Sequence, residues 1–167
     1  MIDNLMRDLR QPEYLHVLLN PLPVYGLAVG IVALIVAIVL RSRPAQVAAL
    51  VAILICAASA WPVVYLGREG YDRVLSMTDE PGRAWLDEHE ERGDDLAWCF
   101  YALAALAAVA IFAPVKWPRC GSPLAAVTLL MSILCVGLGA YVAQAGGKIR
   151  HREFRNVPPP AEATPAP

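Results

Sequence analysis

The chain has 167 residues, of which 57% are hydrophobic and 17% are charged, and its formal net charge is -1. Soluble globular domains are about 45–50% apolar and roughly 25% charged, so this composition excludes an ordinary soluble domain. Lys and Arg together number 14 against 15 Asp and Glu. The absence of any excess positive charge argues against a nucleic-acid-binding protein.

The apolar residues fall into four blocks that contain no charged residue and no histidine, at 21–40, 44–66, 96–115 and 120–147. A helix of about 20 apolar residues crosses a bilayer core of roughly 30 Å. The sequence therefore predicts an all-α integral membrane protein, a four-helix bundle made of two hairpins. The expected spans are about 21–40, 44–66, 96–115 and 123–146 within a transmembrane domain of residues 20–155.

Residues 1–19 predict a short interfacial leader. Apolar residues recur at helical spacing between residues 2 and 9, opposite charged ones, and Pro12 then breaks the pattern. A frayed terminus is the alternative. A secretory signal is not expected, because the leader carries Asp3, Asp8 and Glu13 and the apolar run exceeds the roughly 7–15 residues of a signal core.

Residues 67–95 form the one long connection between spans, with ten acidic residues and four arginines. Asp79 suits a helix N-cap with Pro81 in the first turn. Trp85, Leu86 and His89 then share one face. We expect an amphipathic helical loop of two helices joined near 76–79, the second running from about residue 80 into the third span, with Gly93 as the point of any break.

The basic segment 148–155 follows the fourth span, and residues 156–167 predict a proline-rich disordered tail. With four spans, the leader, loop and tail share one side and carry ten Lys and Arg, against four in the two short turns. The positive-inside rule then predicts cytoplasmic termini. The density of arginine in the first turn favours the opposite orientation.

Small residues mark the faces on which the spans are expected to pack, at Gly26, Gly30, Gly139, Ala143 and Gly147. Packing within the bundle is the preferred use of these faces, and dimerisation is the alternative. The spans contain no ionisable carboxylate, base or histidine, which argues against a pump or an ion-coupled transporter. Intramembrane Ser and Thr are expected to bond to helix carbonyls or across helices.

The four cysteines lack any metal-ligand spacing and predict packing residues. Histidines occur at 16, 89 and 151, all on the side of the termini and just outside the apolar blocks. An aromatic belt with solvated histidines is one interpretation. The other is an interfacial pocket in which His89 and His151 meet, with Asn20 and Tyr25 nearby, and hold haem or a transition metal.

Several short motifs resemble one bacterial family of membrane proteins. They are the segment Asn20-Pro21-Leu22-Pro23-Val24-Tyr25-Gly26, the pair Trp61-Pro62, His89, the pair Gly146-Gly147, and His151. Together they resemble the proteins grouped as domain of unknown function 2231. The resemblance covers about residues 20–151 and implies four membrane helices without an established function. The His-Pro-x-x-x-His pattern typical of that family is changed here, with Asn20 and Tyr25 at its two histidine positions.

The preferred functional prediction is a small non-enzymatic protein of the bacterial inner membrane. It would act as an accessory or scaffold subunit that contacts a membrane protein partner through loop 67–95 or segment 148–155. No cofactor is required by that prediction. The alternative is a membrane redox protein that binds haem b or a transition metal at the interface through His89 and His151.

Overall fold

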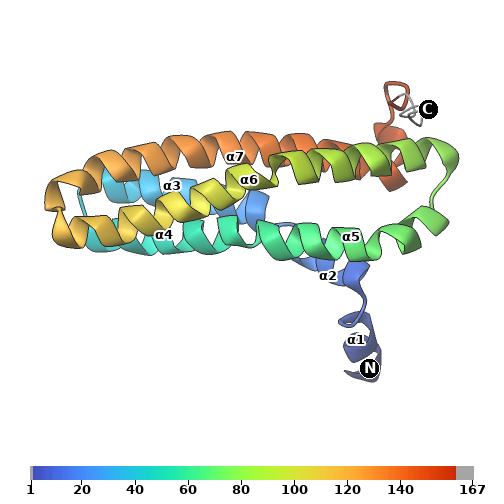
Figure 1. Ribbon diagram of the computed structural model, residues 1–167, viewed down its shortest axis with the longest axis horizontal. Helices are drawn as coiled ribbons and strands as arrows, with labels where there is room; N and C mark the ends of the chain where they lie inside the picture. Colours follow the sequence, from blue (N-terminus) through green and yellow to red (C-terminus); the bar gives the residue numbers. More distant parts are fainter. Residues whose placement is uncertain (1, 161–167) are drawn as a thin grey trace, which may run out of the picture.

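The computed structural model describes residues 2–160, and these residues are almost entirely helical (Figure 1). Four helical stretches, Pro12–Val39, Arg43–Ser76, Glu80–Lys116 and Pro118–Arg150, are long and apolar enough to cross a membrane. This confirms an all-helical chain with four long apolar helices. The elements are α1 (Ile2–Asp8), α2 (Pro12–Leu19), the π-helical η1 (Leu22–Gly26), α3 (Leu27–Val39), α4 (Arg43–Ala58), α5 (Ala60–Ser76), α6 (Glu80–Lys116), the 3-10 turn η2 (Pro118–Cys120), α7 (Gly121–Arg150) and η3 (Arg152–Phe154).

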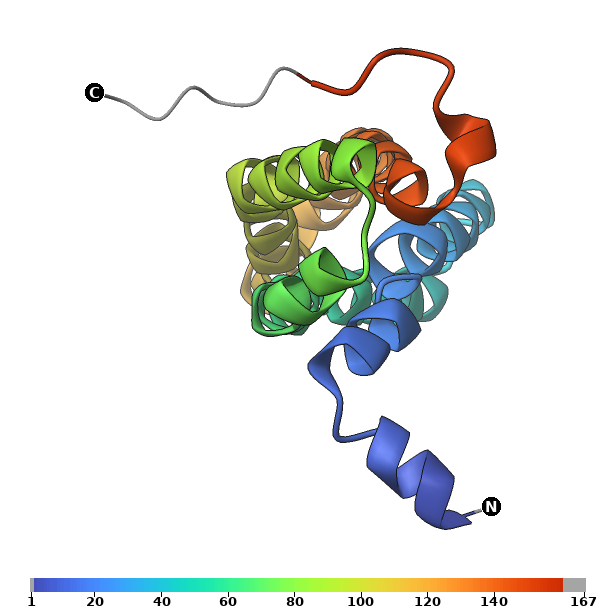
Figure 2. The same ribbon diagram turned by 90° about the vertical axis from the view of Figure 1, so that its right-hand side faces the viewer.

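The helices form two antiparallel pairs that lie side by side. In the first pair, α2, η1 and α3 run against α4 and α5; in the second, α6 runs against α7. Figure 1 shows both ends of the chain at the same end of the molecule, and the short turns between α3 and α4 and around η2 at the other. Each of the four long helical stretches is called a rod below, and the end that carries the chain termini is called the terminal end. Viewed from the terminal end, the four rods lie around a common axis and α1 projects away from them (Figure 2).

The leader expected at residues 1–19 contains two helices. Pro12 occupies the first turn of α2, where its missing N–H costs no hydrogen bond. α2 packs along α5, and the Glu13 carboxylate pairs with Arg73 at 2.6 Å. Residues 12–19 are therefore part of the packed helices, and α1 is the segment that projects from them.

Prolines determine where the rods bend. Pro21 and Pro23 supply no N–H, and the chain passes through the π-helical segment η1 between α2 and α3. Pro62 lies just after the junction of α4 and α5 at Ser59. Pro114 lies inside α6 and leaves the carbonyl of Ala110 without its helical donor. Arg43 fills that role, because its Nη2 donates to the Ala110 carbonyl at 2.9 Å.

Arg43→Leu is expected to lower the free energy of unfolding by about 1–3 kcal/mol, because the Ala110 carbonyl loses its donor. Pro114→Ala restores an N–H at the position that bonds to this carbonyl in a regular helix. In the Pro114→Ala background the cost of Arg43→Leu should therefore shrink. Denaturation of the four proteins in detergent gives the coupling energy, and equal costs in both backgrounds would contradict this account.

The core between the long helices combines small residues with a few large aliphatic side chains, and many other large apolar side chains face outward. The core holds Leu27, Leu34, Leu50, Ile53 and Leu103, all fully buried, with several alanines between them. Gly26 faces Cys56, Gly30 faces Ile53 and Gly139 faces Val24, each so closely that a Cβ would come within 3.0 Å of its neighbour. Other large apolar side chains are exposed, among them Val29, Val36, Ile55, Phe112 and Leu130.

Hydroxyl groups of the long helices donate hydrogen bonds to backbone carbonyls of the preceding turn, as the sequence predicts. Ser59 Oγ donates to Cys56 O at 2.6 Å, Thr128 Oγ1 to Leu124 O at 2.8 Å and Ser132 Oγ to Thr128 O at 2.7 Å. These bonds satisfy the hydroxyls within their own helices, so none of the three needs a partner on a neighbouring helix.

Beyond the main core, α5, α6 and α7 extend toward the terminal end and share a second small core. It consists of Trp85, Leu86, Ala145 and Ile149. The buried Lys148 ammonium lies 3.8 Å from the centre of the Trp85 ring, a cation–π contact. α6 begins at Glu80 and passes through Gly93 as unbroken helix. The acidic connection between spans is thus mostly an extension of two long helices.

Asp79 joins the start of α6 to the segment after α7. Its carboxylate accepts from the Gly82 N–H at 3.1 Å as the N-cap. It also accepts from Arg155 at 2.9 Å through both guanidinium nitrogens and pairs with Arg152 at 3.1 Å. Arg155 in turn donates to the carbonyls of Lys148 and Ile149. Residues 156–160 are not helical, and residues 161–167 of the expected tail lie outside the described range.

The hydrogen bond from Arg155 holds the pKa of Asp79 below its ordinary value, with Gly82 and Arg152 acting in the same direction. A depressed pKa stabilises the folded state above the unfolded value of about 3.9, and this stabilisation is lost as pH falls through the folded pKa. Asp79→Asn keeps a good N-cap but removes the charge. The melting temperature of wild type should exceed that of Asp79→Asn at pH 7, and the gap should narrow progressively as pH falls below about 4. A gap independent of pH would refute the ionic role.

Candidate functional site

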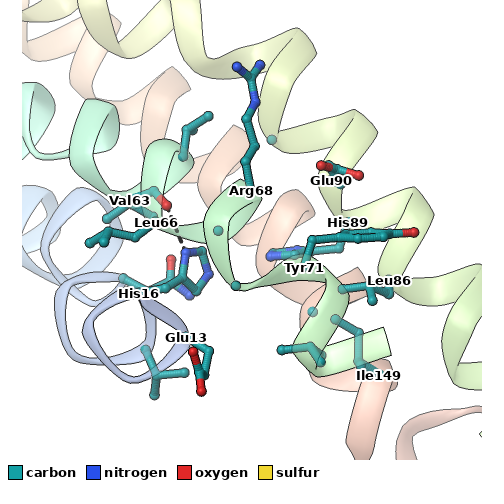
Figure 3. A pocket seen from close by; sticks show the side chains of 18 of the residues that line it. Glu13, His16, Val63, Leu66, Arg68, Tyr71, Leu86, His89, Glu90 and Ile149 are labelled. Carbon is teal, nitrogen blue, oxygen red and sulfur yellow. Dashed lines mark hydrogen bonds between the residues drawn. The ribbon is translucent and has the colours of Figure 1, made fainter. Parts of the chain in front are cut away.

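A cavity of about 780 Å³ lies at the terminal end (Figure 3). Residues of α2, α5, α6 and α7 line it, and most of the lining is apolar. Ligand pockets in proteins typically measure about 300–1,000 Å³ and combine apolar walls with a few polar groups. The polar groups of interest here are two histidines, His16 on α2 and His89 on α6.

His16 is held against α5. Its Nδ1 lies 2.8 Å from the carbonyl oxygen of Val63, the bond that Figure 3 draws as a dashed line. A carbonyl oxygen can accept but not donate, so Nδ1 carries the hydrogen and Nε2 of the neutral ring keeps its lone pair. The ring lies over Gly67, where a Cβ would come to 3.0 Å from Nδ1. Gly67 therefore makes room for this imidazole.

His89 is held against α7 in the same way. Its Nδ1 lies 3.0 Å from the carbonyl oxygen of Val142, and the ring lies over Gly146, where a Cβ would come to 3.0 Å from Nδ1. Burial lowers the pKa of His89 from its usual value, as do His16 and Arg92, while the bond to Val142 opposes the shift. His89 is therefore a neutral imidazole at physiological pH with Nε2 free to accept.

The two helix pairs thus repeat one local arrangement. In each pair, a histidine on the first rod bonds to a valine carbonyl on the second rod and lies on a glycine four residues later: Val63 and Gly67 for His16, Val142 and Gly146 for His89. A backbone carbonyl bonded to Nδ1 is the usual outer-shell partner that orients a metal-binding histidine. The backbone therefore orients both rings through Nδ1, and neither Nε2 is bonded to a residue of the described range.

The two rings lie close together, with centres 6.2 Å apart and planes at 89°. Two imidazoles on opposite sides of one metal ion, each bonded through Nε2 at about 2.0 Å, also have their centres roughly 6 Å apart. The ring-centre separation of His16 and His89 is thus close to that of two imidazoles that share one metal ion. Figure 3 shows the two rings in the cavity, with Leu86 and Ile149 close to His89.

Charged groups surround the mouth of the cavity. Arg68 pairs with Asp94 at 2.8 Å, and Arg73 with Glu13 at 2.6 Å. Tyr71 donates to Asp87, and burial together with this bond raises the pKa of Tyr71 to about 12. Arg150 also lines the cavity, and its guanidinium is exposed near Met77 rather than paired with a carboxylate in the described chain.

The residues singled out from the sequence have different positions. His89 and Asn20 both line the cavity. His151 lies at the cavity edge, where its exposed ring contacts Glu153 at 3.0 Å and stacks on Phe154. Tyr25 is 73% exposed on the outer surface and is not among the lining residues. Of the packing residues, Ala143 also lines the cavity, and Gly147 lies against the Phe154 ring.

The partner of His89 in the structure is His16, which the sequence analysis placed in a leader and did not assign to the site. One signal could have found it. Residues 15–20 contain no charged Asp, Glu, Lys or Arg and lead directly into the first block, with His16 and Asn20 as their two polar residues. That pattern is typical of a helix that packs along its neighbours rather than of a free terminus.

Within residues 2–160, no group of three or more His, Cys, Asp or Glu side chains is arranged to hold a metal ion. The four thiols are unpaired, at Cys56, Cys99, Cys120 and Cys135. The histidine pair therefore offers two protein ligands, and any bare ion bound there would need the rest of its coordination from elsewhere.

Comparison of the chain with models of known protein families, with curated proteins and with solved structures finds no match. The function proposed below therefore depends on the residues and their geometry.

Proposed function

We propose that this chain is a multi-pass protein of a bacterial inner membrane that binds one haem between His16 and His89 and serves as an electron carrier. Membrane insertion is supported by four helices of sufficient length and by the exposed apolar side chains along them. Exposed apolar patches of this extent mark surfaces that contact lipid or another protein. The count of basic residues supports cytoplasmic termini.

An aromatic belt supports the same placement and gives the depth of the site. Trp61, Tyr65, Trp98 and Tyr141 are all exposed, in the half of the rods nearest the termini. Trp and Tyr favour the level of the lipid headgroups. His16 and His89 would then lie at the interface, near enough to water for exchange of electrons with a partner outside the bilayer.

The paired imidazoles are the observation that carries the haem proposal. Each has its Nδ1 bonded to a carbonyl and its Nε2 free, and the ring centres are 6.2 Å apart. Haem iron already has four equatorial nitrogens, so two axial histidines complete its coordination. A bare zinc or copper ion would usually require three or four protein ligands, which favours haem over a free metal ion.

The walls of the cavity suit the parts of a haem other than its iron. The mostly apolar lining would contact a macrocycle, and Arg150 at the edge carries a charge that suits a propionate. When bound, the haem would supply one-electron transfer. The protein's own part is to fix the orientation of both imidazoles through the carbonyls of Val63 and Val142.

This proposal follows the redox alternative of the sequence analysis, with His16 in place of His151. We prefer it to an accessory or scaffold role because a scaffold has no need for two histidines that share one cavity. Membership of the family grouped as domain of unknown function 2231 stays a proposal supported by the motifs quoted above.

The test is to purify the full chain in detergent after expression with ample haem supply, and to record visible spectra of the oxidised and reduced protein. The proposal predicts about one haem per chain and the spectrum of six-coordinate low-spin iron in both states. A colourless protein that also fails to take up added haemin would refute it.

A further inference from the structure

The end of the molecule opposite the haem site carries only positive charge. Arg41 and Arg43 lie in the first turn, and Lys116 and Arg119 in the second. No Asp or Glu occurs between residues 14 and 68 or between residues 96 and 152. Among the described residues, none of these four cations forms an ion pair with a carboxylate.

A second cavity, of about 540 Å³, opens at this end between the two turns. Its lining includes Arg41, Arg43, Gln46 and Ser122. Arg43 is held in place through the Ala110 carbonyl, and its Nη1 is buried without a hydrogen-bond partner among the described residues. α7 begins here at Gly121 with no side-chain cap, so the positive end of its dipole faces the same region.

Gln46 gives independent evidence that the cavity is built for a polar ligand. Its side chain is only 8% exposed and lines the cavity, yet its amide has no hydrogen-bond partner within the described part of the chain. The amide is therefore open to the cavity, where its N–H groups can donate to an oxygen of a bound ligand.

The surroundings of the cavity indicate the source of that oxygen. Val39, Leu40, Phe112 and Val115 are large, apolar and exposed at the same end of the rods. An anion with attached acyl chains would place its charge in the cavity and its chains along these side chains. A free inorganic anion would use the cations but not the apolar surface.

We propose that this cavity binds the phosphodiester headgroup of an anionic phospholipid, through Arg41, Arg43, Gln46 and Ser122. Basic pockets between membrane helices are a known means of binding anionic headgroups. The proposal depends on membrane insertion but not on haem, because residues at opposite ends of the long helices line the two cavities. The bound lipid would neutralise cations that form no ion pair within the described residues.

The experiment measures thermal unfolding of the delipidated full chain in detergent with phosphatidylglycerol, phosphatidylcholine or sodium phosphate at equal phosphate concentration. Phosphatidylglycerol should raise the melting temperature in a saturable way, while the other two should not. Arg41→Gln and Gln46→Leu should each raise the half-saturating lipid concentration about tenfold or more. Arg41 is exposed, so its variant tests binding even if Gln46→Leu does not fold.

Arg83→Gln is the matched control, because Arg83 is an exposed arginine at the terminal end and the charge change is the same. It should bind phosphatidylglycerol like wild type. An equal loss in Arg83→Gln would mean a general effect of net charge and would overturn the proposal. An equal response to sodium phosphate, or to phosphatidylcholine, would overturn recognition of an anionic lipid.

Discussion

His16→Ala and His89→Ala are each expected to lower the affinity for haem by more than about 100-fold, because loss of an outer-shell partner alone typically costs 10–100-fold in metal affinity. Each substitution removes one of the two imidazoles whose centres lie 6.2 Å apart. The remaining histidine could bind iron on one side, so any residual complex should be five-coordinate and high-spin. Titration with haemin, followed in the visible spectrum, measures both effects.

His151→Ala is the matched control for this prediction. His151 is also a histidine near the cavity, but its ring is exposed and contacts Glu153 and Phe154. Its substitution should leave haem affinity within about threefold of wild type, the scatter ordinarily tolerated for a contact that is not a ligand. If His151→Ala abolished binding and His16→Ala did not, the pairing of His89 with His151 expected from the sequence would replace ours.

Gly139→Leu is expected to destabilise the packing of α7 by about 1–3 kcal/mol or more, because it overfills a packed core. Even a Cβ at this position would come to 2.8 Å from Val24 Cγ2 and 3.4 Å from the Phe100 ring. A leucine side chain could fit only if α7 moved away from η1 and α6. The same movement would disturb Val142, and so His89, and haem affinity should fall together with stability.

Gly137→Leu provides the control, two residues away on the same helix. Gly137 is exposed, and a Cβ there would meet nothing within 4 Å. Leucine also has a higher helix propensity than glycine, by about 0.8–1.0 kcal/mol or slightly less. The free energy of unfolding should therefore be unchanged or slightly higher. Equal destabilisation by both substitutions would mean that α7 is not packed through the face of Gly139.

The four long apolar helices could be predicted from the sequence because an uncharged run is a direct requirement of lipid contact. The same rule predicts poorly where each helix ends. The second block stops at residue 66, where charge begins, whereas α5 continues to Ser76. Charge limits where a helix can contact lipid, but hydrogen bonding and packing decide where it ends. In α5 and α6 the second core of Trp85, Leu86 and Ile149 keeps the charged extensions helical.

The site was only partly predictable for a related reason. The sequence indicates that all three histidines lie at one end, because spans alternate in direction. Which two meet depends on tertiary contacts. α2 packs on α5 and brings His16 inward, while Phe154 and Glu153 hold His151 at the surface. The glycines at 67 and 146 matter because of the rings above them, which no spacing along one helix reveals.

The most direct test of the central claim, that His16 and His89 bind one iron, is electron paramagnetic resonance of the ferric full-length protein at low temperature. Axial imidazoles with planes near the observed 89° should give a strongly anisotropic low-spin signal. That signal should be replaced by a high-spin one in His16→Ala. A high-spin signal in wild type, or a low-spin signal that survives loss of either histidine, would contradict the account.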